Sequence, residues 1–277
     1  NEDALVFRGE DRVERRMSRD ELRDAVSIVA QALKADGIGV GDRVGAYIAN
    51  MPEAAICMLA TVSLGATWSS CSPDFGVDGV LDRFGQIEPK VMIAVDGYFY
   101  NGKSHDSLEK ITEILAQLPS VETTIIVPYT RQNPPLENVP NAVQLSNFVA
   151  EFQPGYIEFT RLPFNHPLYI MYSSGTTGTP KCIVHGVGGT LLQHLKEHQL
   201  HVDLRRDDVL FFFTTCGWMM WNWLVSGLAS GATLVLYDGS PFYPSPAAMM
   251  DLAEQEKISV FGTSAKFLSS LEKSGEK

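Results

Sequence analysis

Apolar and polar positions along the first half of the chain alternate between a helical period and an extended one. Residues 18–21, Ser-Arg-Asp-Glu, form a capping box, and apolar residues follow at three- and four-residue spacing as far as Leu33, which predicts an amphipathic helix. Residues 43–49 form a mostly apolar run typical of a buried strand, and Pro52 begins a second helical pattern. This order predicts the beginning of a βαβ unit.

The alternation continues toward the end of the chain. Further strands are predicted at residues 91–95, 124–127, 208–213, 232–237 and 258–261, and further helices at 107–118 and 246–255. Because strands that alternate with helices favour parallel pairing, the sequence predicts an α/β fold with doubly wound, mostly parallel sheets. The pattern weakens between residues 128 and 167, where prolines are frequent. We therefore expect a first α/β subdomain over residues 1–165 and the start of a second over residues 166–277.

Composition and charge exclude several classes of partner. The chain of 277 residues has a formal net charge of −11 and a pI near 5.0, and a negative field does not favour nucleic acid or anionic membranes. The sequence shows no apolar run of about 18 residues and no leader-like N-terminus, so we expect neither a membrane span nor an export signal. Its four cysteines lie far apart without a C-x-x-C pair, which fits a reducing, cytoplasmic location. We expect small-molecule substrates, and an anionic one needs local donors.

The densest set of such donors is the loop Tyr-Ser-Ser-Gly-Thr-Thr-Gly-Thr-Pro-Lys at residues 172–181, between two apolar runs that predict strands. Its glycines let backbone N–H groups turn toward one point, its five Ser and Thr hydroxyls add donors, and its lysine adds a positive charge, which together suit a polyphosphate. It is not a Walker A loop, because a proline precedes the lysine and a strand follows it. A solvated Ser/Gly linker and a kinase-like NTPase are the alternatives.

This decapeptide resembles the phosphate loop of the acyl-adenylate-forming superfamily, which includes the acyl-CoA synthetases. Residues 39–54 and 68–76 resemble upstream segments of short-chain acyl-CoA synthetases, and residues 100–103, 185–198 and 217–223 are most similar to the acetoacetyl-CoA synthetase family. The resemblance implies ATP-dependent activation of a short-chain acid, with acetoacetate as first choice, to an acyl-adenylate and then to its CoA thioester. It thereby implies ATP, Mg²⁺ and coenzyme A as cofactors. An acetyl- or other short-chain acyl-CoA synthetase is the alternative.

The resemblance also implies roles for particular residues. Thr176, Thr177 and Lys181 are expected to act in catalysis, within a phosphate-binding set of Ser173, Ser174, Gly175, Thr176, Thr177, Gly178 and Lys181. The acid pocket is expected at Trp218, Met219, Met220 and Trp221, with ordinary core packing as the alternative for some of them. Lys103 is expected to meet the phosphorylated nucleotide of coenzyme A, the alternative being a solvated surface charge.

A second pattern points to different chemistry. Residues 194–198, His-Leu-Lys-Glu-His, match the H-x-x-E-H pattern of inverted zinc peptidases, and His201 lies one turn further along the same helix face. The sequence offers no second metal-ligand segment, so we expect neither a metal site nor a zinc hydrolase. We expect instead a polar helix face, with Leu191, Leu192, Leu195 and Gln199 near the opposite side.

Three motifs that the resemblance implies are missing after residue 261. They are a Tyr/Trp-x-x-Thr-Glu segment whose Glu helps to hold Mg²⁺, a Thr-Gly-Asp segment whose Asp binds the ribose, and a Lys on a mobile C-terminal lid domain. We therefore expect the chain to carry part of the large N-terminal domain, to lack the lid domain, and to be inactive alone. A non-catalytic fragment with this fold is the alternative.

Overall fold

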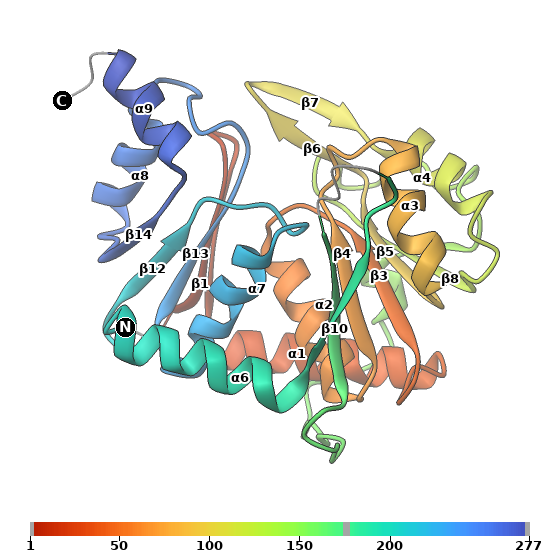
Figure 1. Ribbon diagram of the computed structural model, residues 1–277. Helices are drawn as coiled ribbons and strands as arrows, with labels where there is room; N and C mark the ends of the chain where they lie inside the picture. Colours follow the sequence, from red (N-terminus) through yellow and green to blue (C-terminus); the bar gives the residue numbers. More distant parts are fainter. Residues whose placement is uncertain (1–2, 174–177, 275–277) are drawn as a thin grey trace.

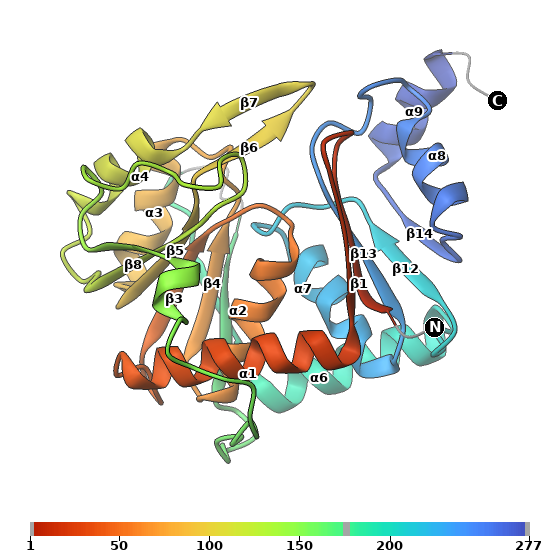
Figure 2. The ribbon, with the colours of Figure 1, turned by 180° about the vertical axis from the view of Figure 1, so that it is seen from behind.

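The computed structural model describes residues 3–173 and 178–274, which form two sheets with a layer of helices between them (Figure 1). Further helices cover the outer face of each sheet, as the view from behind also shows (Figure 2). The predicted α/β class with mostly parallel, doubly wound sheets is confirmed. No helix in the described ranges is both long enough and apolar enough to cross a membrane.

The larger sheet has seven strands in the order β11-β10-β4-β3-β5-β8-β9. Its members are β3 (Arg43–Tyr47), β4 (Thr67–Cys71), β5 (Val91–Val95), β8 (Thr123–Val127), β9 (Ala142–Gln144), β10 (Pro167–Tyr172) and β11 (Cys182–Gly186). Every neighbouring pair is parallel except β10 and β11. Helices α3 (Val77–Ile87) and α4 (Leu108–Leu115) cover its outer face, where Phe84 and Ile111 are buried.

The smaller sheet has five strands in the order β14-β12-β13-β1-β2. Its members are β1 (Asp3–Gly9), β2 (Val13–Ser18), β12 (Val209–Phe212), β13 (Thr233–Asp238) and β14 (Val260–Gly262). Only β1 and β2 pair antiparallel. Helices α8 (Ala248–Gln255) and α9 (Ala265–Ser274) cover its outer face.

The inner layer consists of α1 (Arg19–Ala35), α2 (Pro52–Ser63), α6 (Val187–Lys196) and α7 (Met219–Ser226), with the short turns η1 (Glu197–His201) and η2 (Gly227–Ser230). One apolar core contains residues of α1, α2 and α7 and of both sheets. At its centre the rings of Trp68 and Trp221 stack with centroids 6.4 Å apart. The Trp221 Nε1 donates to Asn50 Oδ1 at 3.0 Å, so the buried indole is also hydrogen-bonded.

The structure agrees with the strongest local signals in the sequence. The predicted capping box is present, since Glu21 N donates to Ser18 Oγ at 3.2 Å and Ser18 N donates to Glu21 Oε2 at 2.7 Å. Pro52 begins α2 as predicted. No sequence pattern predicted β1 and β2, or the hairpin of β6 (Gly97–Tyr100) and β7 (Lys103–Asp106).

The sheets do not follow the order of the chain. Strands β1 and β2 come first in the sequence but belong to the five-stranded sheet, while β10 and β11 come after residue 165 and belong to the seven-stranded sheet. Each half of the sequence therefore contributes strands to the sheet formed mainly by the other half. The division into residues 1–165 and 166–277 stays a prediction, and it does not coincide with the division between the sheets.

Replacing the central indole tests the shared core. Trp221→Phe removes part of a side chain that is 0% exposed and leaves Asn50 Oδ1 without its donor. We expect the free energy of unfolding to fall by about 1–3 kcal/mol, as for other losses of buried volume and hydrogen bonding. Trp218→Phe, at a side chain that is 57% exposed, is the matched control, with an effect within about 0.5 kcal/mol. Equal losses in denaturant unfolding would contradict the assigned core.

Candidate functional site

The carboxyl ends of parallel strands from both sheets meet at one cleft of about 360 Å³. Its lining includes Ser72 to Asp74 after β4, Phe213 to Thr215 after β12, and Asp238 at the end of β13. The hairpin β6–β7 closes one side with Tyr98, Phe99, Tyr100 and His105. Ligands of parallel α/β sheets bind outside the carboxyl ends of the strands, so this edge is the candidate site.

The proposed phosphate loop leaves the same edge of the larger sheet, after β10. Its predicted strand–loop–strand setting is confirmed by the antiparallel pair β10–β11. The loop is closed at its base, because Ser173 N donates to the Lys181 carbonyl at 3.0 Å and Lys181 N donates to Ser173 Oγ at 3.1 Å. Gly178 has φ +142°, a Cβ added to it would meet no atom of the described residues within 4 Å, and the Lys181 side chain is exposed. The predicted residues Ser174, Gly175, Thr176 and Thr177 lie outside the described residues.

The structure separates the four residues predicted for the acid pocket. They lie at the beginning of α7, which follows β12 and the loop 213–218. Trp218 is exposed, Met219 and Met220 are half-buried, and Trp221 is enclosed in the core against Trp68. Among these four, the two methionines combine partial exposure with packing against the core, while the roles of all four stay predictions.

Lys103 begins β7 directly after the tip of the hairpin. Asn101 and Gly102, with φ +53° and +75°, form a two-residue turn of the kind that the Asn-Gly pair favours. The Lys103 side chain is exposed and forms no ion pair within the described part of the chain. In Figure 1 the hairpin leans from the seven-stranded sheet across the top of the molecule. The cross-strand partner of Lys103, Tyr100, lines the cleft, and the assignment of Lys103 to coenzyme A stays a prediction.

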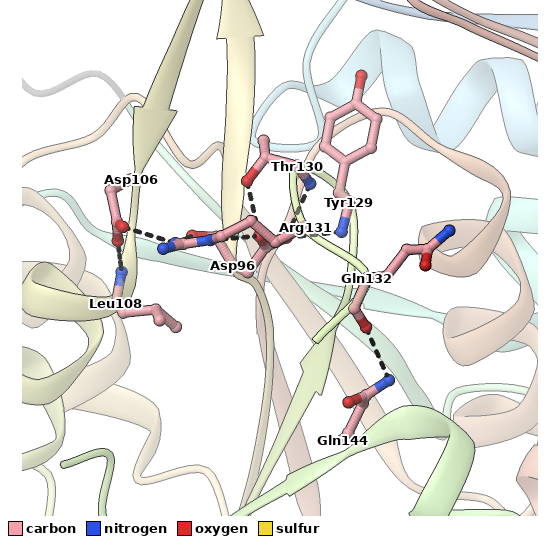
Figure 3. A network of polar contacts seen from close by, with 8 residues as sticks. All are labelled: Asp96, Asp106, Leu108, Tyr129, Thr130, Arg131, Gln132 and Gln144. Carbon is pink, nitrogen blue, oxygen red and sulfur yellow. Dashed lines mark hydrogen bonds and ion pairs between the residues drawn. The ribbon is translucent and has the colours of Figure 1, made fainter. Parts of the chain in front are cut away.

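A network around the buried Asp96 holds the base of this hairpin (Figure 3). The Asp96 carboxylate accepts hydrogen bonds from Tyr129 N at 2.6 Å, Thr130 N at 3.0 Å and Thr130 Oγ1 at 2.6 Å. Arg131 lies between two carboxylates, with Nε 3.3 Å from Asp96 Oδ2 and Nη2 2.5 Å from Asp106 Oδ2. Asp96 precedes β6 and Asp106 ends β7, so the network fixes both strands where they leave the sheet.

The prediction that His194 and His198 lie on a polar helix face is wrong. Both histidines are buried, and the neighbouring Leu191 and Leu192 are exposed instead. His194 Nδ1 lies 2.7 Å from Ser226 Oγ on α7, and the His198 ring packs against Trp223. Burial lowers the pKa of both histidines, to about 4 for His194, so both are neutral at pH 7. Among the described residues no group of three ligand-type side chains could hold a metal ion.

Asp238 is a cleft residue that the sequence did not single out. Its pKa is raised to about 7, first by burial and then by the negative charges of Glu10 and Asp74, while contacts with Tyr129 and the Phe99 backbone oppose the shift. Glu10 and Asp96 were missed as well, because a single acidic residue in a sequence carries no signal of burial. The Asn-Gly pair at 101–102 was the one local signal that could have revealed the hairpin.

Three kinds of comparison with known proteins agree. A family model described as AMP-binding enzyme matches residues 1–277. An acetoacetyl-coenzyme A synthetase of Rhizobium meliloti is 59% identical over 99% of this chain and 42% of its own length, and an acetoacetyl-CoA synthetase of Mus musculus is 51% identical over 91% and 38%. The solved acetoacetyl-CoA synthetase of Streptomyces lividans has a TM-score of 0.94 and 42% identity, and it covers 100% of this chain and 42% of that one. The chain thus spans about two fifths of the length of these relatives.

The raised pKa of Asp238 leads to a pH test in the intact protein. The folded state keeps the Asp238 proton at pH values where the unfolded chain has lost it, so this group costs stability as pH rises from about 4 to about 7. Asp238→Asn removes the titration, and the melting temperature of the variant relative to wild type should therefore rise over this range and level off above it. The difference in free energy of unfolding between variant and wild type should change by at most about 1.4 kcal/mol per pH unit. Asp207→Asn, at an exposed position, is the control, and a pH-independent difference for Asp238→Asn would contradict the shift.

Proposed function

The chain belongs to the AMP-binding enzyme family, and on that premise we propose that the intact protein is an AMP-forming ligase that joins acetoacetate to coenzyme A. The observation that carries the proposal is the match of nearly the whole chain, at 59% identity, to an acetoacetyl-coenzyme A synthetase. The fold supports it, because the loop, whose base is closed by hydrogen bonds, and the cleft both lie at the carboxyl ends of the strands.

The reaction has two steps. In the first, the acid carboxylate attacks the α-phosphorus of ATP, the bond to the pyrophosphate oxygen breaks, and an acyl-adenylate forms. In the second, the thiol sulfur of coenzyme A attacks the acyl carbon, AMP leaves with the electron pair of the broken bond, and the thiol proton is released. Little covalent chemistry falls to the protein, so its task is to position the reactants and to stabilise negative charge.

The loop at 173–181 fits the first step. Its base is held by the paired Ser173 and Lys181, and the Lys181 side chain is exposed. A Cβ added to Gly178 would meet no atom of the described residues within 4 Å. Backbone N–H groups and a cation can therefore approach the phosphates together. We propose Thr176 and Thr177 as further phosphate contacts. Mg²⁺ would be held largely by phosphate oxygens and would supply charge neutralisation.

A related short acid is the second candidate substrate. A malonamoyl-CoA synthetase of Penicillium aethiopicum is 46% identical over 91% of this chain. Acetoacetate and malonamate are both short acids with a carbonyl group two bonds from the carboxyl carbon, and they differ only in a methyl against an amino group. The higher identity to the acetoacetyl-CoA synthetases favours acetoacetate.

We propose a cytoplasmic location as well. All four cysteines are free thiols, and three of them are buried.

Burial raises the pKa of Cys182, which lies next to Lys181, so this thiol is not activated as a nucleophile.

Gly178 tests the phosphate loop. Gly178→Ala adds a side chain at φ +142°, a conformation that alanine adopts only with strain of about 1–3 kcal/mol. We expect acetoacetate-dependent ATP–pyrophosphate exchange by the intact protein to fall at least about tenfold, because 1.4 kcal/mol corresponds to a factor of ten. Gly39→Ala is the matched control, since its new methyl group also meets nothing within 4 Å but its φ is ordinary. Wild-type exchange in the Gly178 variant would refute the assignment.

The length of the acid that the intact protein accepts tests the acid pocket. The half-buried Met219 and Met220 occupy space that a long acyl chain would need. The intact protein should therefore have a kcat/KM for acetoacetate at least about a hundredfold above that for palmitate. The reason is that a pocket filled by these side chains cannot bury the methylene groups of the longer acid. Thioester formation measured with both acids at equal ATP and coenzyme A decides the matter. A preference for palmitate would refute both the pocket and the proposed substrate.

A further inference from the structure

Glu10 is a buried carboxylate in the turn between β1 and β2. It is 8% exposed, its φ is +48°, and its carboxylate accepts three hydrogen bonds from backbone N–H groups. Asn101 N donates to Oε1 at 2.6 Å, Gly102 N donates to Oε2 at 2.9 Å, and Ser240 N donates to Oε1 at 2.9 Å. No cation forms an ion pair with it in the part of the chain that the structure describes, so backbone amides alone compensate the charge.

These hydrogen bonds connect the two sheets across the cleft. Glu10 lies in the turn between two strands of the five-stranded sheet, whereas Asn101 and Gly102 form the tip of the hairpin that follows β5 of the seven-stranded sheet. Ser240 lies in the loop after β13, beside the cleft residue Asp238. One carboxylate therefore holds the hairpin tip against the opposite wall of the cleft.

The surroundings of Glu10 are shaped to seat it. A Cβ on Gly239 would lie 2.1 Å from Glu10 Cγ, and a Cβ on Gly102 would lie 2.7 Å from the Tyr243 ring. Only glycine fits at these two positions, both of which have positive φ. Arg12 adds a second contact to the tip, because its Nη2 donates to the Gly102 carbonyl at 2.7 Å. The tip is thus held on both its N–H and its C=O groups.

We propose that Glu10 is a positioning residue for the second half-reaction. By fixing Asn101 and Gly102, it fixes the backbone of the next residue, Lys103, and so directs the lysine ammonium toward the phosphorylated nucleotide of coenzyme A at the mouth of the cleft. This inference rests on the proposed function and on the prediction that Lys103 meets the phosphorylated nucleotide of coenzyme A. The network at Asp96 holds the hairpin base in the same way, so Glu10 determines the direction of the tip.

The first half-reaction should depend little on Glu10. The phosphate loop is closed by its own pair, Ser173 and Lys181, and it follows β10 rather than the hairpin. A role in positioning coenzyme A therefore predicts a split between the two half-reactions. A general loss of stability would instead lower the rates of both half-reactions.

The test compares Glu10→Gln with Glu14→Gln in the intact protein. Gln places an NH₂ group where one carboxylate oxygen accepts a backbone N–H, which breaks the contact with little change in size. Glu14 lies on the adjacent β2, is half exposed and pairs with Arg8, so its variant is the same chemical change outside the cleft. We expect Glu10→Gln to raise the KM for coenzyme A about tenfold while acetoacetate-dependent ATP–pyrophosphate exchange stays within about twofold of wild type. Glu14→Gln should change neither.

Two further measurements separate positioning from folding. With dephospho-coenzyme A, which lacks the 3′-phosphate, wild type and Glu10→Gln should have nearly equal KM values. The double variant Glu10→Gln/Lys103→Met should be no worse than Lys103→Met alone, because the first residue acts through the second. Additive losses, an unchanged KM for coenzyme A, or equal losses in both half-reactions would overturn the inference.

The wild-type protein supplies the remaining control. If it catalyses no exchange with acetoacetate, the proposed function fails, whatever the variants do. If it forms the thioester and Glu10→Gln behaves as Glu14→Gln, only the role of Glu10 fails. The two failures are therefore distinguishable in one set of assays.

Discussion

A single apolar core shared by both sheets is the constraint on which the rest of the structure depends. Helices α1, α2 and α7 contribute to one cluster with strands of both sheets, and the stacked Trp68 and Trp221 lie within it. Asn50 joins the same region, since it accepts from Trp221 Nε1 and donates to the Thr214 carbonyl at 3.2 Å. Because close-packed interiors resist displacement, the two sheets cannot slide past each other. Their strand ends therefore stay on opposite sides of one cleft.

Buried carboxylates complete what the apolar core begins. Burying a charge is unfavourable unless hydrogen bonds compensate it, and Glu10 and Asp96 each receive three bonds from backbone N–H or hydroxyl groups. The apolar core is non-directional and fixes only the packing of helices and sheets. The carboxylates add direction, because their oxygen atoms select particular amides of particular turns. The hairpin that carries Lys103 is held at both ends in this way.

The charge distribution limits where anionic substrates can be held. The chain carries a formal net charge of −11, and the cleft contains Asp74 and Asp238, with Glu10 close enough to raise the pKa of Asp238. Phosphate groups would be repelled by such a surface without local compensation. The exposed cations at the site edges, Lys181 and Lys103, stand where that compensation is needed. Under the proposed function, affinity for phosphates would therefore be a local property of the loop and the hairpin.

The sequence by itself determined the elements whose signals are local. The capping box at residue 18, the proline that begins α2 and the loop between β10 and β11 are formed by neighbours along the chain, so periodicity and motifs revealed them. The loop also carried the resemblance to the family. The tertiary structure alone decided which strands pair, as where β1 joins β13 more than two hundred residues later. It also decided the burial of His194, His198 and Trp221, and the contacts of Glu10. Such outcomes depend on partners distant in sequence, and a local pattern does not specify them.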